Sequence, residues 1–334
     1  MKVDGGLMGG LDEAGASASR LEALGYSGGI TAETSHDPFF PLLLAARETE
    51  RIELMTSIAV AFSRTPMNLA NIGHDLNSFS KGRFVLGLGS QIRAHITKRF
   101  SMPWSEPAKR MREFILAMRA IWNCWHTGEP LNFRGEFYTH ALMTPMFTPT
   151  DVSWGAPRVF LAAVGPRMTE VAAEVADGVM IHSFTTARYM EEVTLPAIAR
   201  GLARSGRARN EFEIFYPGFV VTGATEEQLA ASKSAVTKQI AFYGSTPNYA
   251  GVLGVHGWGD LQPELNRMSK QGLWDEMGTL ITDEMLNEFA IVGEADEVIT
   301  GFKQRFGKLV DRTTMSLPAR DEDHTRDLIR RLTD

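Results

Sequence analysis

The stretch GRFVLGLGS, residues 82–90, is the clearest structural signal in the chain. It is a short apolar run of the kind that forms a fully buried parallel strand. The run ends in Gly87, Leu88 and Gly89, so the backbone carries little side chain where the strand ends. Glycine there lets a flat ring or a phosphate come close, although tight packing of a strand against a helix requires it equally well. The stretch therefore predicts a strand and leaves both explanations of its glycines open.

Similar apolar runs recur along the chain, and longer amphipathic stretches follow them. This alternation is typical of the βα units that build a parallel sheet. We predict strands at residues 2–7, 27–32, 52–59, 83–88, 158–163, 178–182, 213–221 and 311–317. We predict helices at residues 11–24, 39–49, 66–80, 107–125, 167–176, 186–204, 226–243 and 294–306, with a last helix at 321–332. Eight strands with eight helices favour a closed barrel, so the predicted fold class is α/β, a (β/α)8 TIM barrel.

Two segments exceed a minimal barrel, residues 131–149 after the fourth strand and residues 245–283 after the seventh. The first contains NFRGEFYTH, whose alternation around Gly135 indicates a small hairpin or an irregular excursion. The second is rich in glycine, proline and aromatic residues, and we predict a long irregular insertion with helical pieces after it. Such an insertion is usually a lid or an interface, and both alternatives stay open. No linker separates two cores, so we predict one domain spanning residues 1–334.

Composition limits which partners the protein is expected to bind and in which cellular compartment it is expected. A formal net charge of −6 gives no basic field for a phosphate backbone, so nucleic acid is excluded as a partner. The single cysteine, Cys124, cannot form an internal disulfide or a cysteine-based zinc site. The sequence has neither a signal-peptide pattern at its start nor an apolar run of 18 residues. We therefore expect a cytoplasmic protein with no membrane partner.

Two further segments carry candidate chemistry. The segment AAVGPR, residues 162–167, opens a helix after the fifth strand, and free N–H groups at a helix N-terminus bind anions. An ordinary capped helix explains the segment as well. The segment ETSHDP, residues 33–38, follows the second strand, at the end of a barrel strand where catalytic residues lie. Its His36 could give or take a proton, since imidazoles do so in many active sites, or could be a structural histidine tied to the loop.

Taken together, these segments resemble the luciferase-like monooxygenase superfamily, and in particular its coenzyme F420-dependent branch. The resemblance covers nearly the whole chain, and the order and spacing of the motifs are more specific than any one of them. It is carried by TAETSHDPF (31–39), MTSI (55–58), SRTP (63–66), GRFVLGLGS (82–90), LAAVGP (161–166), ADG (176–178) and FAIVG (289–293).

The resemblance implies a flavin or deazaflavin ring across the barrel mouth, against the second, third and fourth strands. Relatives often carry a non-proline cis peptide in the third strand, and Ser57-Ile58 is the matching dipeptide. The remaining residues that match cofactor-binding positions are Gly89, Ser90 and Gln91 near the ring or tail, and Gly165, Pro166, Arg167, His182 and Ser183 in the phosphate region. His36 matches the active-site histidine of sugar-phosphate and alcohol dehydrogenases in the family, so it is the expected catalytic residue.

The chain departs from those dehydrogenases at three positions. An acidic residue precedes the histidine in the relatives, and Ser35 stands here. Ile92 stands where the relatives carry an acid beyond the glycines of the fourth strand, and Thr185 replaces a lysine found after the sixth strand in some of them. The expected cofactor class survives these changes, but the sugar-phosphate reaction is not expected to transfer.

The leading hypothesis is an F420-dependent oxidoreductase that transfers a hydride between the deazaflavin and a small organic substrate. The alternative is a reduced-FMN-dependent monooxygenase that uses the same barrel mouth, and a non-catalytic flavin-binding protein is a further one. A metal-dependent hydrolase would need ligands at several strand ends; His36, His95 and His182 are available, but no HxH pair exists, so we expect no metal. The expected partners are a small-molecule substrate and a second copy of the chain in a homodimer.

Overall fold

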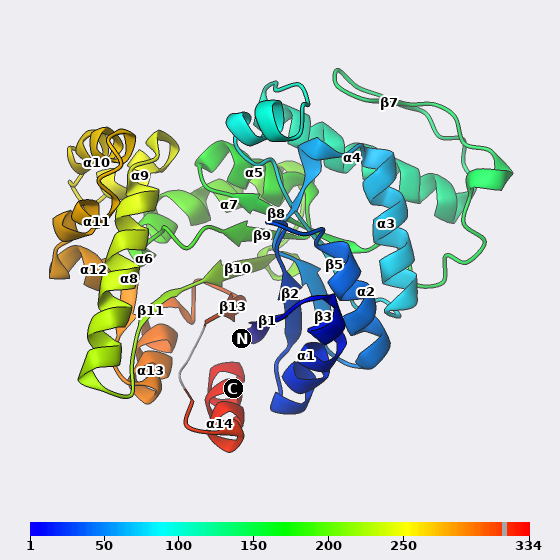
Figure 1. Ribbon diagram of the computed structural model, residues 1–334. Helices are drawn as coiled ribbons and strands as arrows, with labels where there is room; N and C mark the ends of the chain where they lie inside the picture. The colour runs from blue at the N-terminus through cyan, green and yellow to red at the C-terminus, as the bar shows by residue number, and fades with distance from the viewer. Residues whose placement is uncertain (316–318) are drawn as a thin grey trace.

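The computed structural model describes residues 1–315 and 319–334. Eight parallel strands surrounded by helices form the body of the molecule (Figure 1). The barrel strands are β1 (Lys2–Gly6), β2 (Gly28–Thr31), β3 (Glu53–Thr56), β5 (Phe84–Gly89), β8 (Arg158–Ala163), β9 (Gly178–Ile181), β10 (Glu213–Pro217) and β13 (Arg312–Thr314). The main helices are α1 (Leu11–Leu24), α2 (Phe39–Glu48), α3 (Pro66–Phe79), α4 (Pro107–Thr127), α5 (Pro166–Val175), α7 (Leu195–Ser205), α8 (Glu226–Gly244), α13 (Ala295–Phe306) and α14 (Glu322–Thr333).

The sheet closes on itself. Its strands follow one another in the order β3-β2-β1-β13-β10-β9-β8-β5, and β3 pairs with β5 to complete the ring. Every neighbouring pair is parallel, so all eight strands end at the same rim. The predicted (β/α)8 TIM barrel is confirmed.

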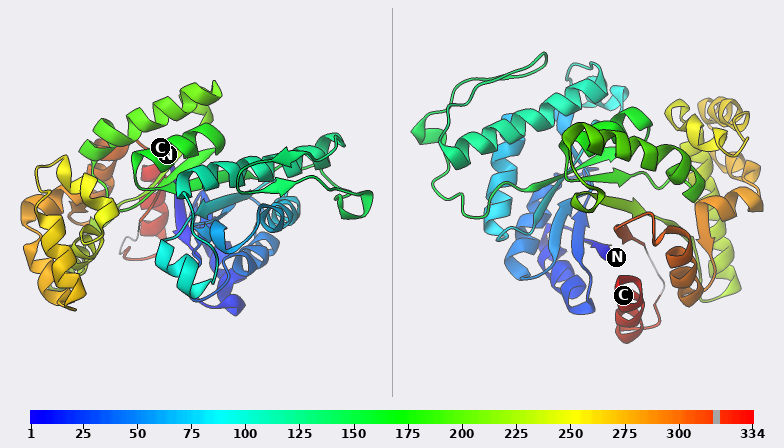
Figure 2. Two further views of the ribbon diagram at one scale, coloured as in Figure 1. Left: turned by 90° about the horizontal axis from the view of Figure 1, so that it is seen from above. Right: turned by 180° about the vertical axis from the view of Figure 1, so that it is seen from behind.

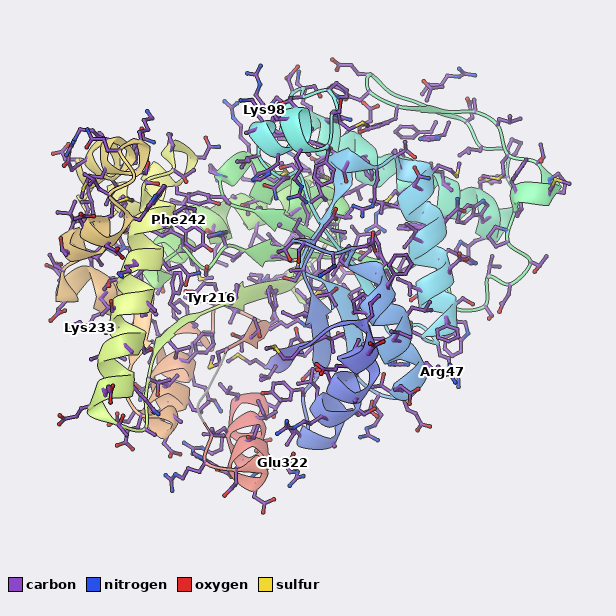
Figure 3. All side chains as sticks on the ribbon, viewed as in Figure 1. Arg47, Lys98, Tyr216, Lys233, Phe242 and Glu322 are labelled. Atoms are coloured by element: carbon purple, nitrogen blue, oxygen red, sulfur yellow. The ribbon has the colours of Figure 1, made fainter. Side chains whose placement is uncertain are left out.

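Alternation along each strand divides its side chains between two cores. In β5, Leu86 and Leu88 join the main apolar cluster between strands and helices, whereas Val85 faces the barrel interior. The interior cluster contains one side chain from each of five strands, namely Met55, Val85, Phe160, Met180 and Phe215. Tyr216, labelled in Figure 3, follows Phe215 and stacks outside the barrel on Phe302, with 6.2 Å between ring centres. The barrel is therefore a packed core, as its period-2 sequence pattern requires.

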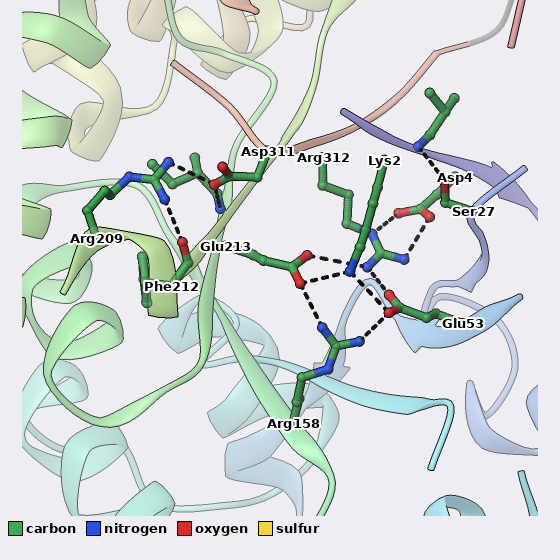
Figure 4. A network of polar contacts seen from close by, with 12 residues as sticks. Lys2, Asp4, Ser27, Glu53, Arg158, Arg209, Phe212, Glu213, Asp311 and Arg312 are labelled. Atoms are coloured by element: carbon green, nitrogen blue, oxygen red, sulfur yellow. Dashed lines mark hydrogen bonds and ion pairs between the residues drawn. The ribbon is translucent and has the colours of Figure 1, made fainter. Parts of the chain in front are cut away.

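Charged side chains fill the end of the barrel where the strands begin, opposite the rim at which they end (Figure 4). The network consists of three cations and three carboxylates, Lys2, Arg158, Arg312, Asp4, Glu53 and Glu213. Arg312 and Asp4 are fully buried and share two hydrogen bonds, with Nη2 donating to Oδ1 at 2.7 Å. Lys2 lies 3.1 Å from Glu53 and 2.9 Å from Glu213, and Arg158 lies 2.6 and 2.7 Å from the same two carboxylates.

Each charge of this network is matched by opposite charges. Burial raises the pKa of Glu53, but the charges of Arg312, Arg158 and Lys2 outweigh burial and lower that pKa to about 2. Burial also lowers the pKa of Arg312, yet Asp4 and Glu53 hold it above its ordinary value. The sequence pattern did not indicate this network, because its members are single charges at the starts of separate apolar runs.

Two predicted strands are interrupted partway along their length. The strand predicted at 52–59 breaks after Thr56, and Ala59–Val60 forms a separate strand, β4, that pairs with β5. At the break, the Thr56 hydroxyl donates to the Gly87 carbonyl at 2.7 Å and accepts from the Gly87 N–H at 2.9 Å. A side chain thus makes the two hydrogen bonds to β5 that the backbone of a continuous strand would make. The strand predicted at 213–221 breaks at Gly218, where the Phe302 ring packs so closely on the backbone that a Cβ would lie 2.6 Å from it.

The residues after that second break leave the barrel. Phe219–Val221 forms β11, which pairs in parallel with β12 (Ala290–Val292) outside the eight-stranded ring. The eighth predicted strand, 311–317, is observed as Arg312–Thr314, and residues 316 and 317 lie outside the described part of the chain.

The helix predicted at 186–204 is also divided. A short helix, α6 (Ala187–Tyr189), leads into a wide π-helical turn at Met190–Thr194, and α7 follows. Pro196 stands at the second residue of α7 and has no N–H to continue an α-helical ladder from the preceding turn, which accounts for the interruption.

The two predicted insertions lie on opposite sides of the barrel (Figure 2). The first contains the expected hairpin, in which β6 (Phe133–Arg134) pairs antiparallel with β7 (Thr139–His140). The second was predicted to be irregular with helical pieces after its glycine-rich start; the helical pieces are observed, but a helix already lies within the glycine-rich start. It contains α9 (Ala250–Gly254), α10 (Leu261–Lys270) and α11 (Trp274–Met277), followed by α12 (Asp283–Phe289). These helices share an apolar cluster with α8, which explains why so many apolar residues occur between the glycines.

The surface leaves several large apolar side chains exposed. On α2, Phe40, Leu43 and Leu44 are 60%, 42% and 37% exposed and lie on one helical face. The expected homodimer and the expected single domain both stay predictions. Within residues 1–315 and 319–334, no helix has the length and apolar character needed to cross a membrane.

Candidate active site

The residues singled out from the sequence follow five neighbouring strands, β2, β3, β5, β8 and β9. Each set lies at the carboxyl end of its strand or in the segment that follows it. Because the strands are parallel and adjacent, these segments share one sector of the barrel rim, the end at which TIM barrels carry their active sites.

The segment after β3 is held against the segment after β2. The peptide bond between Ser57 and Ile58 is cis, as the resemblance implied. The Ser57 N–H donates to the Thr31 carbonyl at 2.6 Å, and the Glu33 N–H donates to the Ile58 carbonyl at 3.2 Å. Ser57 and Ile58 remain half-buried, so they form an accessible surface at the mouth.

The end of β5 lies against that surface. A side chain at Gly89 would meet Cδ1 of Ile58 at 2.7 Å, so this glycine makes room for Ile58. Its role in close approach of a cofactor stays a prediction. Gln91 adopts a left-handed backbone with φ of 57°, and its Oε1 accepts the Ile92 N–H at 2.9 Å. The Ser90 hydroxyl donates to the Gln91 carbonyl at 3.2 Å, which fixes the turn as the chain leaves the strand.

The segment after β8 opens helix α5. Gly165 is its N-cap, Pro166 is its first residue, and no side chain caps the first turn. A side chain at Gly165 would meet nothing within 4 Å, and Arg167 is exposed. An uncapped helix N-terminus with open space and a cation beside it suits an anionic group such as a phosphate.

The segment after β9 contains a neutral histidine. Burial lowers the pKa of His182 to about 4, so the ring carries no charge at neutral pH. Its Nδ1 accepts the Phe184 N–H at 3.0 Å, which leaves the ring proton on Nε2. Tyr243 and Tyr249 pack against the ring, with 4.5 and 4.9 Å between centres. His182 is therefore a hydrogen-bond donor at the rim rather than a base, with the half-buried Ser183 beside it.

A small cavity lies between α5 and the segment after β9. Its lining includes Val164, Thr169, His182, Thr185 and Thr194. The Thr185 hydroxyl is buried and has no hydrogen-bond partner within the described residues. A buried hydroxyl without a partner costs free energy, so this cavity is suited to a polar group that accepts or donates there.

The second insertion is attached to this part of the rim. The Thr186 hydroxyl and Nε2 of His256 are 2.8 Å apart, and His256 stacks on Trp258 with 4.4 Å between ring centres. Tyr249, from the same insertion, packs on His182. The aromatic residues of the insertion thus reach the site, and whether it acts as a lid or as an interface stays open.

His36 lies on an exposed turn between β2 and α2. Sequence reasoning missed the side chains that hold this turn, Glu33, Asp37 and Arg64, which form two ion pairs at 2.7 and 3.0 Å. The SRTP motif contains Arg64, but nothing in the sequence pairs it with residues about thirty positions earlier. No group of three or more metal-binding side chains occurs in the part of the chain that the structure describes.

The chain is similar to known proteins over most of its length. The family model for luciferase-like monooxygenases matches residues 2–312. An uncharacterized protein of Mycobacterium tuberculosis is 57% identical over 312 residues, covering 93% of this chain and 92% of that protein. The 5,10-methylenetetrahydromethanopterin reductase of Archaeoglobus fulgidus is 29% identical over 264 residues, covering 77% and 74%. The F420-dependent glucose-6-phosphate dehydrogenase of Nocardia farcinica is 30% identical over 180 residues, covering 52% and 51%.

Solved structures share the fold. The coenzyme F420-dependent tetrahydromethanopterin reductase from Methanopyrus kandleri aligns with a TM-score of 0.77 at 19% identity, covering 98% of this chain and 96% of that one. The oxygenating constituent of 3,6-diketocamphane monooxygenase from Pseudomonas putida, solved with FMN, aligns with a TM-score of 0.62 at 16% identity, covering 97% and 91%. At these identities the likeness establishes the barrel architecture.

Proposed function

We propose, from the premise that this chain belongs to the luciferase-like monooxygenase family, that it is an F420-dependent oxidoreductase acting on a small organic substrate. The observation that carries the proposal is the rim sector where the segments after β2, β3, β5, β8 and β9 meet. F420 is favoured over FMN because the matched reductase of Methanopyrus kandleri and dehydrogenase of Nocardia farcinica are named for it. The sugar-phosphate reaction is not carried over, because Ser35, Ile92 and Thr185 depart from the dehydrogenase pattern.

The residues of the rim fit an elongated cofactor with a flat ring and a phosphate. Ser57, Ile58, Gly89, Ser90 and Gln91 would lie along the ring, where Ile58 offers an apolar face and the Gly89 backbone lies directly behind it. When bound, the deazaflavin supplies a carbon that gives or takes a hydride.

The phosphate region follows at the next two strand ends. Gly165, Pro166 and Arg167 would hold the anion at the uncapped start of α5. His182 would donate from Nε2 toward the cofactor, with Ser183 beside it. Because His182 is neutral above about pH 4, this donor keeps its form throughout the neutral range.

His36 would exchange a proton with the substrate while the hydride moves. The residue is exposed on the turn that follows β2. An imidazole is suited to this role because it both gives and takes a proton near neutral pH.

Titration of the purified protein with F420 and with FMN tests the proposal. We expect F420 to bind at least about tenfold more tightly, a difference of about 1.4 kcal/mol. Quenching of cofactor fluorescence and equilibrium dialysis measure both affinities. Tighter binding of FMN would instead support the reduced-FMN monooxygenase. Binding of neither cofactor would overturn the proposed function.

Replacing His36 with alanine is expected to lower turnover by about 10²-fold, the scale of general acid–base catalysis. Cofactor affinity and melting temperature should change little, because His36 is exposed. F420 absorbance followed across a panel of alcohols and aldehydes identifies a substrate, and steady-state kinetics then compare the variants. His95→Ala is the control, since His95 is also exposed and follows β5, which ends at the same rim. Equal turnover in both variants would show that His36 is not catalytic.

A further inference from the structure

Arg64 joins the segments that follow two neighbouring strands of the rim. Its Nη1 donates to Oε2 of Glu33 at 2.7 Å and to the Val60 carbonyl at 3.2 Å. Its Nη2 donates to Oδ2 of Asp37 at 3.0 Å. The side chain is only 17% exposed, so a nearly buried guanidinium connects the turn after β4 with the turn after β2.

Glu33 ties the other side of the same junction. Its Oε2 accepts the Val60 N–H at 2.8 Å in addition to Arg64, and its own N–H donates to the Ile58 carbonyl at 3.2 Å. The side chain is 7% exposed, so its charge depends on the guanidinium for compensation. Glu33 and Arg64 therefore hold the half-buried surface at Ser57 and Ile58 in a fixed place beside the turn that follows β2.

Asp37 fixes the end of the same turn. Its Oδ1 accepts the Phe39 N–H at 2.9 Å, which anchors the turn to the start of α2, while its Oδ2 receives Arg64. His36 lies between Glu33 and Asp37 and is exposed. The two carboxylates that Arg64 grips are thus on either side of His36, three residues before it and one residue after it.

We propose that Arg64 is a positioning residue that sets the place of the His36 imidazole relative to the Ser57–Ile58 surface. Its Nη1 and Nη2 donate to two different carboxylates at once. The planar guanidinium of arginine provides this geometry, and the single ammonium of lysine does not. The proposal rests on the proposed function only for the role of His36. The geometric link itself is a property of the chain without any ligand.

The first test uses the protein without cofactor. The proton NMR signal of the His36 ring, assigned with His36→Ala, should shift in Arg64→Lys, while the signal of His95 stays in place. Arg47→Lys is the control, because Arg47 is 74% exposed on the adjacent helix α2. Asp37→Asn provides a second variant: it keeps the Glu33–Arg64 pair and an oxygen that can accept the Phe39 N–H, and it weakens only the ion pair beside His36. An unchanged His36 signal in both Arg64→Lys and Asp37→Asn would overturn the proposal.

The second test is a double-mutant cycle with the substrate that the alcohol and aldehyde panel identifies. Arg64→Lys should lower kcat by about tenfold to a hundredfold, the cost of misplacing a catalytic group, with cofactor affinity changed by no more than about threefold. In the His36→Ala background the same substitution should have no further effect, because the group it positions is gone. Losses that multiply would show that Arg64 does not act through His36. A failed cofactor titration with a shifted His36 signal would reject the proposed function and leave the positioning link standing.

Discussion

Replacing Glu53 with glutamine is expected to lower the free energy of unfolding by about 3–5 kcal/mol at neutral pH, the usual cost of removing one partner from a buried ionic network. Glu53 is 21% exposed and lies within ion-pair distance of Lys2, Arg158 and Arg312. Glutamine keeps the size of the side chain but leaves three cations facing two carboxylates. Urea unfolding followed by circular dichroism measures the loss.

The effect should depend on pH in one direction. Because the charges around it lower the pKa of Glu53 in the folded protein to about 2, its contribution is fully present above the ordinary carboxyl pKa of about 4.3. The contribution is lost as pH falls toward 2, where the folded protein also takes up the proton. The difference between wild type and Glu53→Gln should therefore be largest near pH 7 and shrink steadily below about pH 4.

Asp275→Asn is the matched control for this measurement. Asp275 lies 2.6 Å from Lys238, but it is 85% exposed, and exposed ion pairs contribute at most about 1 kcal/mol. If Glu53→Gln costs no more than Asp275→Asn, or costs the same at pH 3 as at pH 7, the ionic network does not stabilise the barrel through Glu53.

Replacing Gly87 with alanine is expected to destabilise the protein by about 3 kcal/mol or more, at the upper end of overpacking costs. The added methyl carbon would lie 1.8 Å from the Thr56 carbonyl oxygen and 2.9 Å from the Met180 sulfur. The Thr56 carbonyl belongs to the backbone of β3, which the Thr56 hydroxyl also ties to Gly87 by two hydrogen bonds. The substitution therefore has to separate β3 from β5, where the barrel closes.

Thermal unfolding compares this variant with Gly254→Ala. A methyl carbon at Gly254 would meet nothing within 4 Å, and the residue ends helix α9, so alanine should be neutral or slightly stabilising. Should Gly87→Ala not fold, its yield in inclusion bodies against soluble Gly254→Ala gives the same answer. Equal melting temperatures for the two variants would show that β3 and β5 are not held as closely as the structure indicates.

The barrel could be predicted from the sequence because each of its βα units is specified by residues that are close together in the chain. Apolar runs of strand length followed by amphipathic stretches determine βα units one at a time, and parallel units close at eight. The breaks at Thr56 and Gly218 could not be predicted in this way. At the first break the Thr56 hydroxyl bonds to Gly87, and at the second the Phe302 ring packs against Gly218. Both partners lie far along the chain from the break.

The rim was predicted more completely than the side chains that support it. Strand ends are visible in a sequence, so the segments bearing His36, Ser57, Gly89, Gly165 and His182 were found. The partners of those segments were missed. Asp4 and Arg312 are 308 positions apart, and Arg64 lies 31 positions from Glu33. No periodic pattern encodes a pair of single charges at such separations.

The interior of the barrel has a consequence for where a ligand can approach. Aromatic and aliphatic side chains occupy its middle, and salt-bridged ones fill the end where the strands begin. The barrel is consequently filled below its rim, so a ligand meets this end of the molecule at the surface formed by the segments that follow the strands. Two ligands bound there would have to lie beside each other on that surface.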